Sequence, residues 1–164
     1  MLRDKCGYEN SVKDKTNLVP HNVWTCGDYT KNLNGFTVNP DNQNLFIDLD
    51  NTFVVNGDNN ILIHRLTPQS YYAQAYYTYT LNPDDYGKTF IFTANVKNNL
   101  NGNCSIQIAG DSLKFSNIPK DSEGVFSLTY SNVTSNSIRV VVAFAGTVTG
   151  KVYFDNLVLN VIDD

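Results

Sequence analysis

This sequence offers few arrangements of acids, bases or nucleophiles that could catalyse a reaction. His21 and His64 are its only histidines, and they lie in unrelated sequence contexts. The serine-nucleophile motif of hydrolases, the zinc-protease motif and the phosphate-binding loop are all absent. Asp48 and Asp50 would point the same way from a strand end, as hydrolytic carboxylates do, but a solvated strand edge explains the pair more simply. The inventory predicts a protein that binds a partner and is not an enzyme.

A run of tyrosines and amides offers a different chemistry. The run consists of Tyr71, Tyr72, Gln74, Tyr76, Tyr77 and Tyr79. Flat aromatic rings stack on the apolar faces of sugar rings, and amides hydrogen-bond to sugar hydroxyls. Side chains alternate between the two faces of a strand, so Tyr72 and Tyr76 point outward if Tyr77 and Tyr79 point into the core. The outward residues predict a platform for carbohydrate, and packing of the same rings between two sheets is the alternative.

Outward positions on neighbouring strands would complete such a platform. Strand alternation is expected to bring Asn95, Gln107 and Arg139 beside the outward tyrosines, although ordinary solvated strand faces carry the same residue types. Trp24, the only tryptophan, could stack on a sugar, but a core anchor or a lid over one end of the fold explains it more simply. The predicted carbohydrate-binding set is Tyr72, Tyr76, Asn95, Gln107, Arg139 and Trp24.

Charge and hydropathy argue against two other kinds of partner. The chain carries 12 basic and 16 acidic residues, a formal net charge of −4, and its basic residues are dispersed. Nucleic acid binding requires clustered Lys and Arg, so it is not expected. No apolar run approaches the roughly 18 residues that a membrane-spanning helix needs. These features predict a soluble protein, and the outward aromatic and amide side chains predict that its partner is a glycan or a cell-surface polysaccharide.

The three cysteines and the N-terminal residues limit the domain organisation. Cys6, Cys26 and Cys104 form no CxxC pair, so a zinc site is not expected. A disulfide between Cys6 and Cys26 would pin the N-terminal segment, and three unpaired thiols with Cys104 buried in a strand are the alternative. Residues 1–16 are polar, lack the apolar core of a secretory signal, and are predicted to be a tail or a linker remnant. Residues 17–164 are predicted to form one domain.

The elements that must position these side chains are almost all β-strands. Helical periodicity is nearly absent, while short alternating runs recur between clusters of Asn, Gly, Pro and Asp. The predicted strands are Leu45–Leu49, Thr52–Val55, Ile61–Leu66, Tyr76–Leu81, Thr89–Lys97, Cys104–Ile108, Leu113–Phe115, Val125–Tyr130, Ser137–Ala145 and Lys151–Val161. The strand at 137–145 is apolar on both faces, which indicates a central position. This pattern predicts an all-β fold, a two-sheet antiparallel jelly-roll β-sandwich.

Three segments, in sequence order, carry a resemblance to a known family. Asn17-Leu18-Val19-Pro20 precedes Trp24 by a few residues, YYTYTLNPDDYGKTFIFTANVK fills 76–97 with a Gly-Lys-Thr-aromatic step, and KVYFDNL at 151–157 contains an aromatic-Asp-Asn signature. Together they resemble the first strand, paired middle strands and final strand of galactose-binding-like jelly rolls. These carbohydrate-binding-module-like domains occur beside glycoside hydrolases and in phage tail or minor structural proteins. The resemblance covers roughly residues 17–161.

The resemblance implies a non-catalytic carbohydrate-binding domain of a phage tail, receptor-binding or cell-surface protein, located on a virion tail or an extracellular surface. It also implies a structural calcium ion, to which the last-strand aspartate, here Asp155, contributes an oxygen ligand. The acidic residue usual near the end of the first strand is missing, since His21, Asn22 and Val23 stand there. The alternative function is a structural β-sandwich without ligand, a spacer or assembly domain of a virion or surface fibre, whose tyrosines pack against another subunit in a homo-oligomer or a larger assembly.

Overall fold

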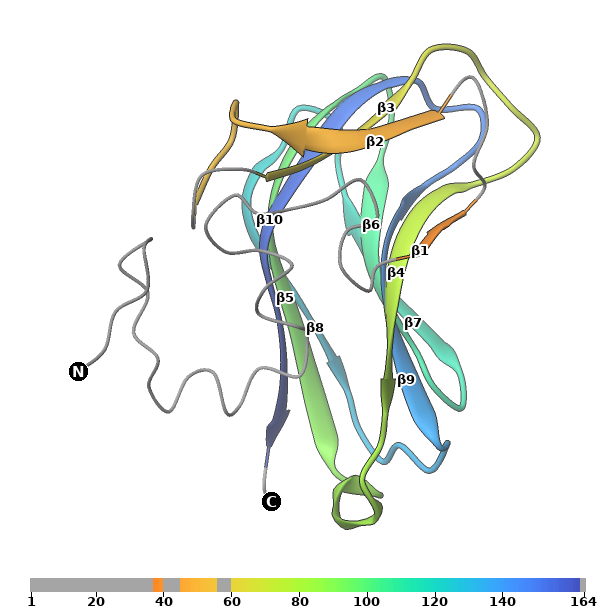
Figure 1. Ribbon diagram of the computed structural model, residues 1–164, viewed down its shortest axis with the longest axis vertical. Helices are drawn as coiled ribbons and strands as arrows, with labels where there is room; N and C mark the ends of the chain where they lie inside the picture. The colour runs from red at the N-terminus through yellow and green to blue at the C-terminus, as the bar shows by residue number, and fades with distance from the viewer. Residues whose placement is uncertain (1–36, 40–44, 56–59, 163–164) are drawn as a thin grey trace.

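The computed structural model describes residues 37–39, 45–55 and 60–162 (Figure 1). The predicted tail at 1–16, the first-strand motif, Trp24, Cys6 and Cys26 lie outside the described residues. Cys104 is buried in a strand, as expected. Among the described residues, no helix is long and apolar enough to span a membrane.

Ten strands and one short 3-10 helix make up the described chain. They are β1 (Thr37–Asn39), β2 (Leu45–Asp50), β3 (Asn60–Arg65), β4 (Ala73–Thr80), η3 (Pro83–Asp85), β5 (Thr89–Leu100), β6 (Cys104–Ala109), β7 (Leu113–Ile118), β8 (Glu123–Tyr130), β9 (Ser137–Phe144) and β10 (Gly150–Ile162). The predicted strand Thr52–Val55 is wrong. The Asp50 carboxylate accepts a hydrogen bond from the Thr52 backbone N–H at 2.6 Å, and this local turn ends β2 there.

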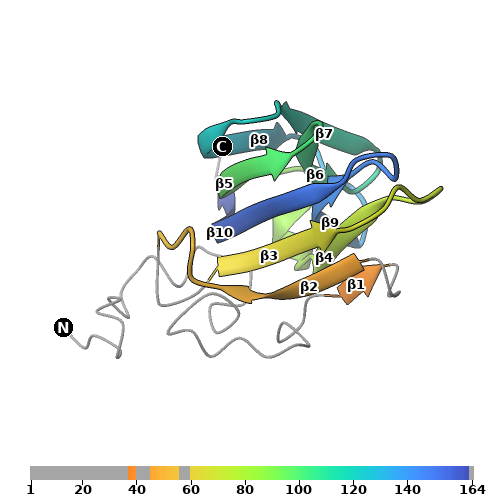
Figure 2. The ribbon, with the colours of Figure 1, turned by 90° about the horizontal axis from the view of Figure 1, so that it is seen from above.

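The strands form two five-stranded antiparallel sheets that pack face to face (Figures 1 and 2). The strand order is β1-β4-β9-β6-β7 in one sheet, here called the groove sheet, and β2-β3-β10-β5-β8 in the other. Figure 2 shows β1 and β2 at one side of the sandwich and β7 and β8 at the other. Consecutive strands therefore often lie in different sheets, and the predicted jelly-roll sandwich is confirmed.

Strand alternation explains the core. On β5, Phe90, Phe92, Ala94 and Val96 are all fully buried between the sheets. Strand β9 lies in the middle of the groove sheet and is buried along nearly its whole length, which confirms the central strand predicted at 137–145.

The aromatic-Asp-Asn signature on β10 forms a β-bulge. The register against β5 shifts between Asp155 and Val158. Asn156 has a φ of 48°, in the left-handed region that Asn tolerates better than most residues. The extra residue lets Phe154 and Leu157 both reach the core, although they are three positions apart.

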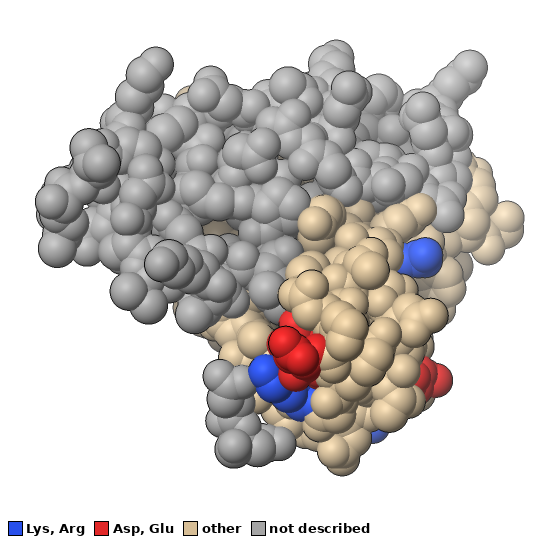
Figure 3. All heavy atoms as spheres, turned by 60° about the horizontal axis from the view of Figure 1, so that its bottom comes forward, with Lys and Arg blue, Asp and Glu red and all other residues tan. Residues whose placement is uncertain are grey.

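Charged side chains are scattered on the end of the sandwich that carries η3. Figure 3 shows acidic and basic side chains interspersed on the described part of this face. Lys88 and Asp85 form an ion pair there, with 3.4 Å between Nζ and Oδ1.

Candidate functional site

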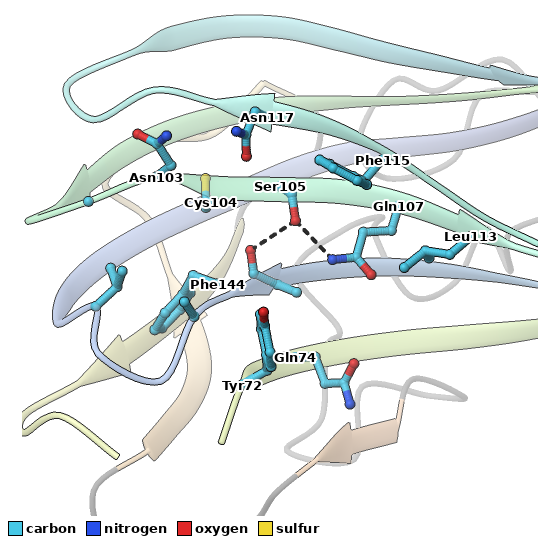
Figure 4. Close-up of a pocket in the computed structure, with 14 residues that line it drawn as sticks. Tyr72, Gln74, Asn103, Cys104, Ser105, Gln107, Leu113, Phe115, Asn117 and Phe144 are labelled. Atoms are coloured by element: carbon cyan, nitrogen blue, oxygen red, sulfur yellow. Dashed lines mark hydrogen bonds between the residues drawn. The ribbon is translucent and has the colours of Figure 1, made fainter. Parts of the chain in front are cut away.

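A groove lies on the outer face of the groove sheet (Figure 4). Its volume is about 770 Å³. The described residues that line it are Tyr72, Gln74, Gly102, Asn103, Cys104, Ser105, Gln107, Leu113, Phe115, Asn117, Ala143, Phe144, Ala145 and Val148. They come from β4 and the residue before it, from β6, β7 and β9, and from the turns that follow β5 and β9.

Side-chain size explains why the sheet is hollow there. The strand registers place Gln74, Ala143, Ser105 and Asn117 in one row across β4, β9, β6 and β7. Residues directly opposite one another on paired strands point to the same face of the sheet. The two middle strands therefore contribute small side chains to this row and the two flanking strands contribute long amides. The middle of the row forms the floor of the groove and its ends form the walls.

Two exposed aromatic rings stand on opposite sides of this hollow. Tyr72 precedes β4 and is 62% exposed, and Phe115 on β7 is 61% exposed. Strands β4 and β7 are separated by three strand spacings, or about 14 Å. Phe115 shares a row with Tyr76, four residues beyond Tyr72, so the two rings lie roughly 20 Å apart along a diagonal. The groove is thus long enough to present both rings to one extended ligand.

The polar groups of the groove are neutral. Gln107 Nε2 donates to Ser105 Oγ at 3.0 Å, and Ser105 Oγ donates to the Ala143 carbonyl at 3.5 Å (Figure 4). The side chains of Gln74 and Asn117 make no hydrogen bond within the described part of the chain. Their amides are therefore available to a ligand, each as both donor and acceptor.

The thiol of Cys104 does not supply a nucleophile. Burial raises its pKa to about 12, so the thiol stays protonated at neutral pH. Among the described lining residues there is no Asp, Glu, His, Lys or Arg. The groove can therefore stack on and hydrogen-bond to a ligand, and its described side chains provide no acid–base pair.

A buried arginine contacts residues at one end of the groove. Arg65, the last residue of β3, donates from Nη1 to the Ala145 carbonyl oxygen at 3.2 Å. Its guanidinium carbon lies 5.3 Å from the ring centroids of both Tyr71 and Phe144. Burial lowers the pKa of this guanidinium. Arg65 thus contacts Phe144, a core residue that also lines the groove, and the tyrosine that precedes Tyr72.

A buried asparagine holds the turn that carries Gly102 and Asn103. Asn98 Nδ2 lies within 3.1 Å of three carbonyl oxygens, those of Gly102, Ile118 and Pro119. Its Oδ1 accepts a hydrogen bond from the Leu100 backbone N–H at 3.0 Å. One side chain therefore ties the turn after β5 to the turn after β7.

The structure brings together only part of the predicted binding set. Tyr72 and Gln107 line the groove. Tyr76 and Arg139 lie on the same outer face but beside the groove, with the Arg139 guanidinium carbon 4.4 Å from the centroid of the Tyr76 ring. Of the two remaining predicted residues, Asn95 lies in the other sheet and Trp24 lies outside the described residues.

The expectation that Asn95 shares this face is wrong. Strand β5 belongs to the other sheet, where Asn95 pairs with Asp155 of β10 and is 9% exposed. Sequence alternation assigns a side chain to one face of its own strand, but it does not say in which sheet that strand lies. The jelly-roll order places β9 and β6, not β5, beyond β4.

Sequence reasoning missed the wall formed by β7. Leu113, Phe115 and Asn117 alternate along this strand, and all three line the groove. The alternation is visible in the sequence, but an apolar side of a short strand is ordinarily assigned to the core. Here the apolar side faces outward, since Leu113 and Phe115 are exposed.

Asp155 lies in a polar layer on the outer face of the other sheet. It is fully buried, and its Oδ2 accepts a hydrogen bond from the Val55 backbone N–H at 2.5 Å. Asn60 is one position before Ile61, which pairs with Phe154, and its buried Oδ1 accepts no hydrogen bond within the described residues. Carboxylate and amide oxygens are the ligands calcium takes. The described residues contain no cluster of three His, Cys, Asp or Glu side chains, so this pair would hold an ion only with other oxygen ligands.

Comparisons with known proteins show likeness in structure and none in sequence. No protein-family model and no curated protein matches the chain. The enzymatically active domain of tailspike protein 4 from bacteriophage CBA120 matches 90% of the chain with a TM-score of 0.68 and 13% identity, and the chain spans 22% of that protein. TmCBM61, solved in complex with β-1,4-galactotriose, matches 89% of the chain and 99% of its own length, with a TM-score of 0.59 and 12% identity.

A family 22 carbohydrate-binding module of Clostridium thermocellum Xyn10B matches 87% of the chain and 96% of its own length, with a TM-score of 0.53 and 13% identity. At such identities the likeness establishes the fold. The chain has the jelly-roll fold of carbohydrate-binding modules.

Proposed function

We propose that this domain is a non-catalytic carbohydrate-binding module whose ligand, a glycan or cell-surface polysaccharide, lies in the groove. The observation that carries the proposal is the pairing of Tyr72 and Phe115, two exposed rings on opposite sides of one hollow. Large apolar side chains exposed around a concave surface are typical of binding sites. Amides between the rings would hydrogen-bond to the hydroxyls of a sugar chain.

The expected affinity is modest for a single site. Each aromatic contact contributes on the order of 1 kcal/mol, and two rings therefore contribute a factor of about 30 in affinity. Display of many copies on one particle or surface would multiply this by avidity. Weak single sites of this kind suit a protein that holds a polymer reversibly.

Binding without cleavage is also supported by the groove chemistry. Glycoside hydrolysis ordinarily uses a pair of carboxylates that flank the scissile bond. The described lining residues include no carboxylate. The groove is therefore expected to retain a polysaccharide without shortening it.

The fold neighbours support a place on a virion tail or an extracellular surface. One neighbour is a domain of a phage tailspike protein, and others are carbohydrate-binding modules. A larger protein that carries this domain would use it to hold a substrate or a host surface polymer.

The proposal is tested by screening the purified 164-residue chain against a glycan array and a panel of polysaccharides that includes β-1,4-galactan and xylan. We expect retention of at least one polymer, lost on substitution of both Tyr72 and Phe115 by Ala. No retention of any glycan, together with a concentration-dependent oligomer that buries both rings, would refute the proposal and favour the structural-spacer alternative.

A further inference from the structure

Arg65 carries a positive charge that is buried, and its burial is unfavourable for the free energy of folding. Its side chain is 1% exposed, and it points between the sheets on the same face of β3 as Ile61 and Ile63. Nη1 makes the hydrogen bond to Ala145, while Nε and Nη2 make none within the described chain. Taking a charge out of water without a full set of hydrogen bonds destabilises a fold, and apolar replacements of similar size are often neutral or stabilising. Stability alone therefore gives no reason for an arginine at this position.

Two of the three residues that Arg65 contacts line the groove. Its hydrogen-bond acceptor, Ala145, and one of its two ring partners, Phe144, line the groove. The other ring partner, Tyr71, immediately precedes Tyr72, the exposed ring of the wall. Arg65 thus reaches from the opposite sheet to two residues that line this end of the groove and to the neighbour of the wall residue Tyr72.

The backbone at this end is packed tightly. The Gln69 backbone N–H donates to the Gly146 carbonyl oxygen at 2.8 Å. A Cβ at Gly146 would lie 2.3 Å from the Gln69 carbonyl oxygen and 2.6 Å from that of Tyr71, so only glycine allows this approach. Segment 69–72 therefore lies directly on segment 144–146, and Arg65 contacts both.

We infer that Arg65 is a positioning residue for the groove. It holds segment 69–72 against segment 144–146 so that the Tyr72 ring is already oriented for a ligand. The inference rests on the proposed function for its purpose, but the positioning itself is a property of the free protein. Orienting a ring before binding removes part of the entropy cost of ordering it in the complex.

The free protein provides the first test, through amide hydrogen exchange of wild type and Arg65→Met. Methionine keeps much of the side-chain length and removes the charge and the hydrogen bond to Ala145. We expect the Gln69 amide, which bonds to Gly146, to exchange at least about tenfold faster in Arg65→Met. Amides of β5 should be unchanged, and the melting temperature should stay equal or rise.

Binding provides the second test, using the polysaccharide that the wild-type domain retains from the panel containing β-1,4-galactan and xylan. At a temperature where every variant is fully folded, Arg65→Met should bind about three- to tenfold more weakly. Leu81→Ala is the matched control, because Leu81 is a buried residue after the far end of β4. It should lower the melting temperature and leave binding unchanged, and Arg65→Lys should recover part of the affinity.

Three results would overturn the inference. One is an unchanged Gln69 exchange rate in Arg65→Met, and another is an unchanged affinity for the retained polysaccharide. The third is a large drop in melting temperature with faster exchange throughout the sandwich, which would make Arg65 an ordinary stabilising residue. If no polysaccharide binds to wild type while Gln69 exchange still accelerates, the proposed function fails and the positioning role of Arg65 in the free protein stands.

Discussion

Removing the ring of Tyr72 is expected to weaken glycan binding while leaving the domain folded. Tyr72 lies at the groove wall and is 62% exposed, so little of its side chain contributes to the core. Exposed substitutions of this kind usually change the free energy of unfolding by less than about 0.5 kcal/mol. Loss of one stacked ring costs on the order of 1 kcal/mol in binding, a factor of about five in the dissociation constant. Tyr72→Ala should therefore weaken glycan binding and leave the free energy of unfolding nearly unchanged.

Tyr76→Ala is the matched control on the same strand. Tyr76 faces the same side of the sheet but does not line the groove, and its ring lies under Arg139. A cation–π contact at an exposed site contributes about 0.5–1 kcal/mol, and the partly buried ring adds packing. We expect Tyr76→Ala to lower the free energy of unfolding by about 1 kcal/mol or more and to keep the wild-type affinity.

The two variants are compared by affinity electrophoresis in the retained polysaccharide and by thermal melting. Tyr72 would be a core residue, and the groove assignment mistaken, if Tyr72→Ala lost several kcal/mol of stability. Equal losses of affinity in both variants would show that the ligand extends past the groove to Tyr76 and Arg139, as the sequence-based set predicted.

Three further predictions concern the metal, the ligand charge and the turn beside the groove. Calcium should raise the melting temperature of the domain, because an ion bound only by the folded state stabilises that state, and Asp155→Asn should abolish the rise. Equal melting temperatures in calcium and in chelator would leave Asp155 as a structural hydrogen-bond acceptor. The described lining of the groove is neutral, so the groove should prefer uncharged polysaccharides. In affinity gels, Gln74→Lys should raise binding to an acidic polysaccharide, whereas Thr78→Lys, an exposed control on the same face of β4, should leave that binding unchanged. Asn98→Ala removes the donor shared by three carbonyls and should cost about 2–4 kcal/mol in denaturant unfolding, and a loss below about 0.5 kcal/mol would contradict its role in the turn.

Alternation along single strands was enough to predict the core. The alternate residues of β5 are buried because every second side chain of a strand points to the same face of the sheet. They are Phe90, Phe92, Ala94 and Val96. The central place of β9 also follows from composition, since a strand with neighbours on both sides can bury apolar side chains on both of its faces. The jelly-roll architecture therefore follows from local patterns together with the need to cover two sheet faces.

The sequence did not show which strands pair with one another or in which sheet each strand lies. Asn95 and Gln107 both point away from the core, yet they face opposite sides of the molecule because β5 and β6 belong to different sheets. The groove itself depends on cross-strand neighbours, such as Ala143 between Gln74 and Ser105, that are far apart in sequence. A hollow made by small residues in one row becomes visible only when the register of four strands is known.

The alternation of the groove sheet also separates two kinds of evolutionary constraint. On β4, Ala73 and Ala75 face the core while Gln74 faces the groove, and on β6, Ile106 lies between the groove residues Ser105 and Gln107. Substitutions at the groove positions change the surface of the groove and leave in place the packing that the intervening positions maintain. Under the proposed function, a change at a wall residue such as Phe115 would therefore alter the ligand while leaving the fold intact.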